Sequence, residues 1–143
     1  LGINHTAVTR LLVGGAERLR ADATGVTVKA AVGLGYGTGA GGTVTQATSK
    51  GTDVTLNKPT GQITTHTASM SAGTTVAFWV NNSLVASTDT VIANVSSAAD
   101  RGAYTLTIGA DSGRFGVYLK NVSAGSLAEA VVINFTIFKG ANA

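Results

Sequence analysis

The stretch Gly33-Leu-Gly-Tyr-Gly-Thr-Gly-Ala-Gly-Gly42 divides this chain of 143 residues into two unlike parts. Six of its ten residues are glycine, and each glycine inside a helix costs roughly 1 kcal/mol relative to alanine, so the stretch excludes a helix. Glycine instead permits positive φ angles and close backbone approach. The sequence therefore predicts an extended segment over 1–32, a junction over 33–42 and a compact β domain over 43–143.

Residues 43–143 have the pattern of short strands separated by turns. Apolar and polar side chains alternate over Thr75–Asn81 and Arg114–Val122, which is typical of strands with one buried face. Asp111-Ser112-Gly113, between two alternating segments, indicates a hairpin. About eight short strands at this spacing predict an all-β fold, an antiparallel β-sandwich or jelly-roll-like domain. The expected strands are Thr43–Ser49, Asp53–Leu56, Gly61–His66, Thr75–Asn81, Val91–Val95, Ala103–Gly109, Arg114–Val122 and Ala130–Lys139.

The last expected strand, Ala130–Lys139, is the most apolar of the eight. Its apolar side chains point to both faces, so the strand is either central in the fold or covered on its second face by another copy of the chain. We expect Val131, Ile133, Phe135 and Phe138 to contribute to an interface between copies.

The segment before the glycine-rich stretch alternates short strands with turns. The pattern predicts strands over Leu11–Val13, Ala16–Asp22 and Val26–Val32, separated by glycine-containing turns. A segment this short has little of its own to bury an apolar face against, so it needs stacking neighbours or other chains.

Two resemblances bear on this organisation. Gly15-Ala-Glu-Arg-Leu-Arg-Ala-Asp-Ala-Thr-Gly-Val-Thr-Val28 resembles the short β repeat in the shafts of bacteriophage tail fibres and tail spikes. From Gly35 onward the chain also resembles C-terminal domains of phage structural proteins, in Gly35-Tyr-Gly-Thr-Gly39 and in Asn134-Phe-Thr-Ile-Phe-Lys-Gly140. The first resemblance implies a homotrimer. The second includes head-decoration (cement) proteins as well as fibres, so it does not decide between them.

Composition excludes several classes of function. Only 12% of residues are charged, and the net charge of +3 is scattered without a basic cluster, so we expect no nucleic-acid partner. The chain has no cysteine, which excludes disulfides, thiolate catalysis and a cysteine zinc site. No apolar run reaches the ~18 residues of a membrane helix, so we expect no membrane insertion. We also expect no bound metal.

The chemistry of an enzyme is not apparent in the sequence. Gly37-Thr-Gly-Ala-Gly-Gly42 formally fits a dinucleotide fingerprint, but Thr43–Gln46 predicts a strand where that motif needs a helix. We therefore expect no cofactor. Asp89, Asp100 and Asp111 lie in or beside loops, where aspartate side chains commonly accept hydrogen bonds from the backbone of the turn. Paired carboxylates for glycoside hydrolysis or for cation binding are the alternative.

Trp79 is the only tryptophan. Its neighbours Phe78 and Val80 occupy the expected core face, so Trp79 points to solvent, to a second sheet or to another copy. An exposed ring would stack on the apolar face of a sugar, and Tyr36 and Tyr118 carry the same ambiguity. The expected ligand-binding residues are Trp79, Asn81, Asn82, Asp100, Arg101 and Ser126.

Three functions follow from these observations. The first is a non-enzymatic virion protein, made in the host bacterial cytoplasm, whose trimeric fibre or spike tip binds a glycan or protein of the host surface. The second is a decoration protein that binds the major capsid protein and stabilises the phage head. The third is a polysaccharide-degrading tailspike, which the shortage of paired carboxylates disfavours.

Overall fold

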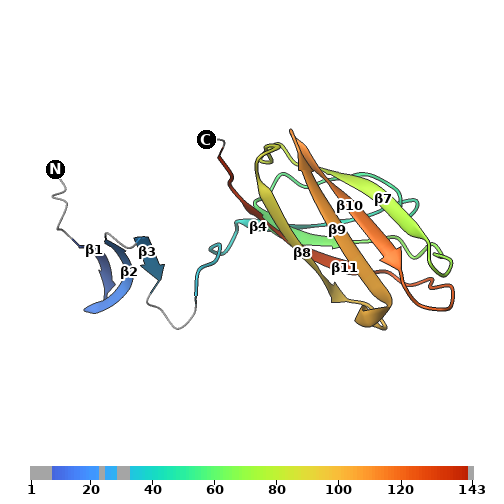
Figure 1. Cartoon of the computed structure of the whole chain (residues 1–143), viewed down its shortest axis with the longest axis horizontal. Helices are drawn as coiled ribbons and strands as arrows, with labels where there is room; N and C mark the ends of the chain where they lie inside the picture. The colour runs from blue at the N-terminus through green and yellow to red at the C-terminus, as the bar shows by residue number, and fades with distance from the viewer. Residues whose placement is uncertain (1–7, 23–24, 29–32, 142–143) are drawn as a thin grey trace. The chain divides into compact units, whose positions relative to one another are not determined.

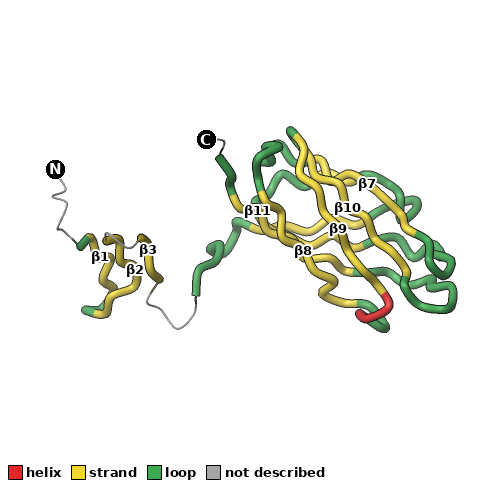
Figure 2. The backbone as a smooth tube through the Cα atoms, in the orientation of Figure 1, coloured by secondary structure: helices red, strands yellow, loops and turns green. Residues whose placement is uncertain are grey.

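The computed structural model describes residues 8–22, 25–28 and 33–141. The chain divides into two compact units, Leu1–Tyr36 and Gly37–Ala143. Every regular element in the described ranges is a strand, apart from one 3-10 turn, η1 (Arg101–Ala103) (Figure 1; Figure 2). The all-β prediction is confirmed.

The first unit contains one antiparallel sheet with the strand order β1-β2-β3. Its strands are β1 (Thr9–Val13), β2 (Ala16–Asp22) and β3 (Gly25–Val28). All three coincide with expected strands, although residues 29–32 of the third expected strand lie outside the described residues. Gly14 and Gly15, with φ of 61° and 78°, form the β1–β2 turn in the conformation that glycine favours.

One face of this sheet is apolar. Leu11, Leu19 and Val28 lie directly opposite one another across the three strands and therefore share a face. None of the described residues of this unit is buried: Leu11 is 57% exposed and Val26 is 70% exposed. The sheet therefore forms hydrogen bonds between its strands without covering its apolar side chains.

The second unit contains two four-stranded sheets. We call them the β10 sheet (β5-β7-β10-β9) and the β11 sheet (β4-β6-β11-β8) after one central strand of each. The strands are β4 (Gly41–Thr45), β5 (Val54–Thr55), β6 (Thr60–Thr64), β7 (Thr75–Asn81), β8 (Thr90–Ser97), β9 (Tyr104–Asp111), β10 (Arg114–Asn121) and β11 (Val132–Phe138). Each coincides with an expected strand, with shifts of a few residues at most ends.

The strand pairing is mixed, whereas an antiparallel arrangement was predicted. Four pairs in these sheets are antiparallel, but β4 pairs with β6 in parallel and β5 pairs with β7 in parallel. The chain passes from one sheet to the other at each step from β4 to β7. A strand two steps later therefore returns to the same sheet in the same direction, and it pairs in parallel.

Side chains from both sheets form one core between them. Inward positions on β7, β10 and β11 alternate with outward ones, as the sequence pattern predicted. Phe115 of β10 and Phe135 of β11 meet across the core with ring centres 5.0 Å apart and a tilt of 52°. The buried apolar residues include Ile63, Phe78, Val80, Phe115, Val117, Leu119, Val131, Ile133, Phe135 and Ile137.

The apolar C-terminal strand, β11, is central in its sheet, flanked by β6 and β8. Val131 and Ile133 have no exposed surface and Phe135 has 2%. Packing inside this unit, rather than contact with another copy, accounts for these three side chains, so the interface predicted for them is not available. Phe138 is 49% exposed, and its interface role stays a prediction.

Candidate functional site

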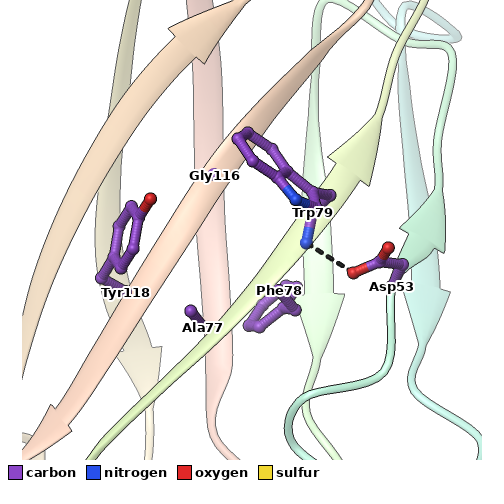
Figure 3. A pocket seen from close by; sticks show the side chains of 6 residues that line it. All are labelled: Asp53, Ala77, Phe78, Trp79, Gly116 and Tyr118. Atoms are coloured by element: carbon purple, nitrogen blue, oxygen red, sulfur yellow. Dashed lines mark hydrogen bonds between the residues drawn. The ribbon is translucent and has the colours of Figure 1, made fainter.

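A small pocket of about 110 Å³ lies on the outer face of the β10 sheet (Figure 3). Two aromatic side chains, Trp79 and Tyr118, line it, with Gly116 between them in this view. The lining residues are Asp53, Ala77, Phe78, Trp79, Gly116 and Tyr118. The pocket contains one of the predicted ligand-binding residues, Trp79.

Strand register explains how the two rings come together. Trp79 lies directly opposite Gly116, and Ala77 lies directly opposite Tyr118, on the neighbouring strands β7 and β10. Alternation sends Phe78 into the core and Trp79 outward, so the prediction that Trp79 points away from the core is correct. Small residues therefore alternate with large rings on this face, which leaves room between the rings.

Gly116 is buried although it belongs to the outer face of the sheet. A Cβ atom there would lie 3.2 Å from Cζ3 of Trp79 and 3.2 Å from Cε2 of Tyr118. Glycine thus lets both rings lie close over the strand. A glycine in the middle of an alternating strand often marks such a close approach, and this signal was present in the sequence.

Asp53 supplies a carboxylate at the edge of the pocket. It lies just before β5, and its Oδ1 accepts a hydrogen bond of 2.8 Å from the backbone N–H of Trp79 (Figure 3). The residue is exposed, and a carboxylate accepts several hydrogen bonds. It is therefore positioned to accept hydrogen bonds from hydroxyl groups beside the rings.

Arg114 lies against Trp79. Its guanidinium carbon is 4.0 Å from the centre of the indole ring, a cation–π contact. Asp111 holds this guanidinium: Nε and Nη2 of Arg114 each donate to Oδ2 of Asp111 at 3.2 Å. The hydrogen bond from the Ser112 backbone and the one from Arg114 lower the pKa of Asp111. The guanidinium therefore already covers one face of the indole.

Two aromatic rings, small residues between them and a carboxylate form an arrangement suited to one ring of a sugar. Aromatic faces and edges pack against C–H groups, while the carboxylate accepts from vicinal hydroxyls. Asp53 and Gly116 were not among the predicted ligand-binding residues. Tyr118 was noted only as an aromatic residue whose role was open.

Asn82 is not available to a ligand, contrary to the prediction. It is 1% exposed; its Nδ2 donates to Lys58 O at 2.8 Å and its Oδ1 accepts from Leu84 N at 3.0 Å. Its side chain therefore forms hydrogen bonds with the backbone of the surrounding loops. Asn81 is exposed at the end of β7, directly opposite Arg114, two residues along the strand from Trp79.

The remaining predicted residues lie at the other end of the β10 sheet. Asp100 precedes η1 and caps it, accepting from Gly102 N at 2.8 Å. The last residue of η1, Ala103, lies beside the end of β10, because its carbonyl accepts a hydrogen bond from the backbone N–H of Val122. The structure therefore does not bring the other predicted residues of this end, Arg101 and Ser126, together with Trp79.

The carboxylates considered for hydrolysis or cation binding have other contacts. Asp89 is buried and accepts from Ala86 N at 2.8 Å, from Gly140 N at 3.0 Å and from the Lys139 ammonium. These interactions, led by the backbone hydrogen bond of Ala86, lower its pKa to about 2. Across residues 8–22, 25–28 and 33–141, no three His, Cys, Asp or Glu side chains gather in a way that could hold a metal ion.

Comparisons with protein-family models, with curated proteins and with solved structures found no match. In the part of the chain that the structure describes, no helix has the length and hydropathy needed to cross a membrane.

Proposed function

We propose that this chain is a bacteriophage virion protein that binds a glycan of the host surface through the pocket between Trp79 and Tyr118. In this proposal the 37–143 unit is a β-sandwich tip of a tail fibre or spike, and the 1–36 unit is the end of its shaft. The resemblances at Gly15–Val28 and Asn134–Gly140 support the class of protein.

The pocket is the observation that carries the binding role. It combines two aromatic side chains with an exposed carboxylate, Asp53, on the outer face of the β10 sheet. The carboxylates considered as an alternative for hydrolysis have other contacts: Asp100 caps η1, Asp89 accepts backbone hydrogen bonds and Asp111 pairs with Arg114. These contacts favour binding without catalysis.

Self-association completes the proposal. The apolar face of the β1-β2-β3 sheet, with Leu11 and Val26 largely exposed, would be covered by the same face of two other copies in a homotrimer. Burial of apolar side chains contributes about 25 cal/mol per Å². Three copies would also present three pockets, so the affinity of each site for its glycan can be weak.

A direct test uses an array of bacterial O-antigen and capsular oligosaccharides, probed with the labelled full chain. The matched variants are Trp79→Ala and Thr105→Ala; Thr105 is an exposed residue on the same face, opposite Lys120 and outside the pocket. Binding that Thr105→Ala retains and Trp79→Ala loses supports the proposal. Binding of the same oligosaccharide that Trp79→Ala retains at full strength contradicts it.

A decoration protein that binds the major capsid protein is the alternative. The exposed apolar side chains of β1 and β3 favour it equally, because an arm lying on a neighbouring capsid subunit would also cover them. The measured mass decides between the two: a stable trimer in solution supports the fibre. A monomer that binds empty phage heads and not host cells supports decoration.

A further inference from the structure

The β11 sheet carries a second, chemically different surface. A groove of about 490 Å³ lies on its outer face, and the Trp79 pocket lies on the other sheet. The lining residues are Gly41, Gly42, Thr60, Gly61, Gln62, Asn94, Asn134, Phe135 and Thr136. None of them is charged or cysteine, and the only aromatic one, Phe135, is a core residue.

Register arranges the polar side chains of the groove in rows. Asn134 on β11 lies directly opposite Asn94 on β8 and Gln62 on β6, so three amides span three strands. The next row pairs Thr136 with Thr60. Because Ile133 and Phe135 of β11 point into the core, all these polar side chains share the outer face.

The hydroxyl row has a defined direction of hydrogen bonding. Oγ1 of Thr60 donates to the carbonyl oxygen of Phe135 at 2.8 Å and lies 3.1 Å from Oγ1 of Thr136. A hydroxyl has one proton, so Thr136 must donate to Thr60. The oxygen of Thr136 then keeps lone pairs that can accept from a ligand.

The amide row is left without partners. Oδ1 of Asn134 is buried and accepts no hydrogen bond from any described residue. The side chains of Gln62 and Asn94 form no hydrogen bond within the described part of the chain either. Buried polar atoms in native proteins are nearly always paired, so the enclosed Oδ1 of Asn134 lacks a donor, which a ligand would supply after a small shift of this partly exposed side chain.

From these observations we infer that the groove is a second binding site, and that its ligand is a neutral saccharide. The groove offers amide donors, amide acceptors and a hydroxyl acceptor at neighbouring positions, which matches a ligand that carries several hydroxyl groups. The absence of charge from its lining gives no advantage to an acidic sugar. No exposed ring belongs to the lining, so we expect the affinity to depend on hydrogen bonds and to be roughly millimolar.

This inference does not rest on the proposed function of the Trp79 pocket. The two surfaces belong to different sheets, so a variant in one leaves the other intact. Trp79→Ala is therefore expected to bind a saccharide in the groove as the unchanged chain does. If saccharide binding is absent at one surface and present at the other, the surface without binding identifies the proposal that has failed.

The test is a titration of the isotope-labelled full chain, followed by the side-chain amide NMR signals of Asn94, Asn134 and Gln62. The probes are the methyl glycosides of glucose, galactose and mannose, with glucuronic acid as the charged comparison. We expect saturable shifts of the three amide signals with at least one neutral glycoside and weaker shifts with glucuronic acid. The absence of shifts with all three neutral glycosides would overturn the inference.

Two variants localise the binding. Asn134→Ala removes the orphaned acceptor, and Thr136→Val removes the hydroxyl while keeping the side-chain shape; each is expected to weaken binding about tenfold, the value of one good hydrogen bond. The control is Thr45→Ala, an exposed position on β4 outside the groove. Binding that neither groove variant weakens, in chains whose backbone spectra remain native, would also overturn it.

Discussion

The indole of Trp79 lies over Gly116, its direct partner on the next strand, where a Cβ atom would come within 3.2 Å of the ring. The same Cβ atom would lie 3.2 Å from the ring of Tyr118. One missing side chain thus sets the position of both rings of the pocket. The pocket depends on a glycine in the middle of a strand, where glycine weakens the strand itself.

Gly116→Ala is expected to displace both rings and weaken glycan binding by about tenfold or more. The rings are surface side chains that can shift by a few tenths of an ångström, so the change in the free energy of unfolding stays within about 1 kcal/mol. The control is Gly109→Ala on β9, directly opposite Gly116, where a Cβ meets nothing within 4 Å. Equal binding by both variants would show that the rings do not need Gly116.

Gly61→Ala is expected to destabilise the 37–143 unit by about 1–3 kcal/mol, the usual cost of overpacking a core. A Cβ at Gly61 would lie 2.6 Å from the carbonyl oxygen of Gly42 and 2.8 Å from Leu56, and backbone cannot move as a surface ring can. Gly41→Ala is the control, because its nearest contact would be an ordinary 3.6 Å. Denaturant unfolding gives the free energy of unfolding of both variants. A Gly61→Ala chain as stable as Gly41→Ala would contradict the packing described.

Asp89 makes folding stability depend on pH at the acidic end. Its pKa is about 2 in the folded chain, below its ordinary value of 3.8, so the folded state favours the charged form. This contribution is fully present above pH 3.8 and is lost as the pH falls toward 2. We expect Asp89→Asn to lower the melting temperature at neutral pH, and the gap to the unchanged chain to narrow between pH 4 and pH 2. A gap that is constant over this range would show that the carboxylate is not the group responsible.

Leu11→Ser is expected to dissociate the proposed trimer, because it places a hydroxyl on the apolar face of the β1-β2-β3 sheet. Leu11 is 57% exposed within its own chain, so the substitution leaves the fold of the single chain intact. Thr27→Ala, on the opposite face of that sheet, serves as the control. Sedimentation equilibrium gives the mass of each; a chain that is already monomeric before substitution would contradict self-association through this face.

The sequence predicted the strands of the second unit well because their signal is local. Alternation with a period of two identified β7 and β10, and Asp111-Ser112-Gly113 identified the turn between β9 and β10, where Gly113 has a φ of 76°. The parallel pairing of β4 with β6 had no local signal. It depends on which sheet each strand joins, and that is decided by packing.

The site was predicted only in part for a similar reason. Trp79 could be singled out as an outward aromatic, but its contact with Asp53 joins residues 26 positions apart. Asn82 was misassigned because a turn asparagine serves a ligand or its own loop equally well on sequence grounds. Lys50 shows the same limit: it is 2% exposed, and its ammonium donates to the carbonyls of His66 and Glu129, whereas lysine is usually a surface residue.

The most direct measurement of the glycan-binding claim uses the single tryptophan of the chain as its reporter. An oligosaccharide that binds on the array is titrated into the full chain while the emission of Trp79 is recorded. We predict a saturable change in emission with the same midpoint as binding measured by calorimetry, and the loss of binding at that midpoint from the calorimetric titration of Trp79→Ala. Calorimetric binding that leaves the emission unchanged and persists in Trp79→Ala would contradict the account.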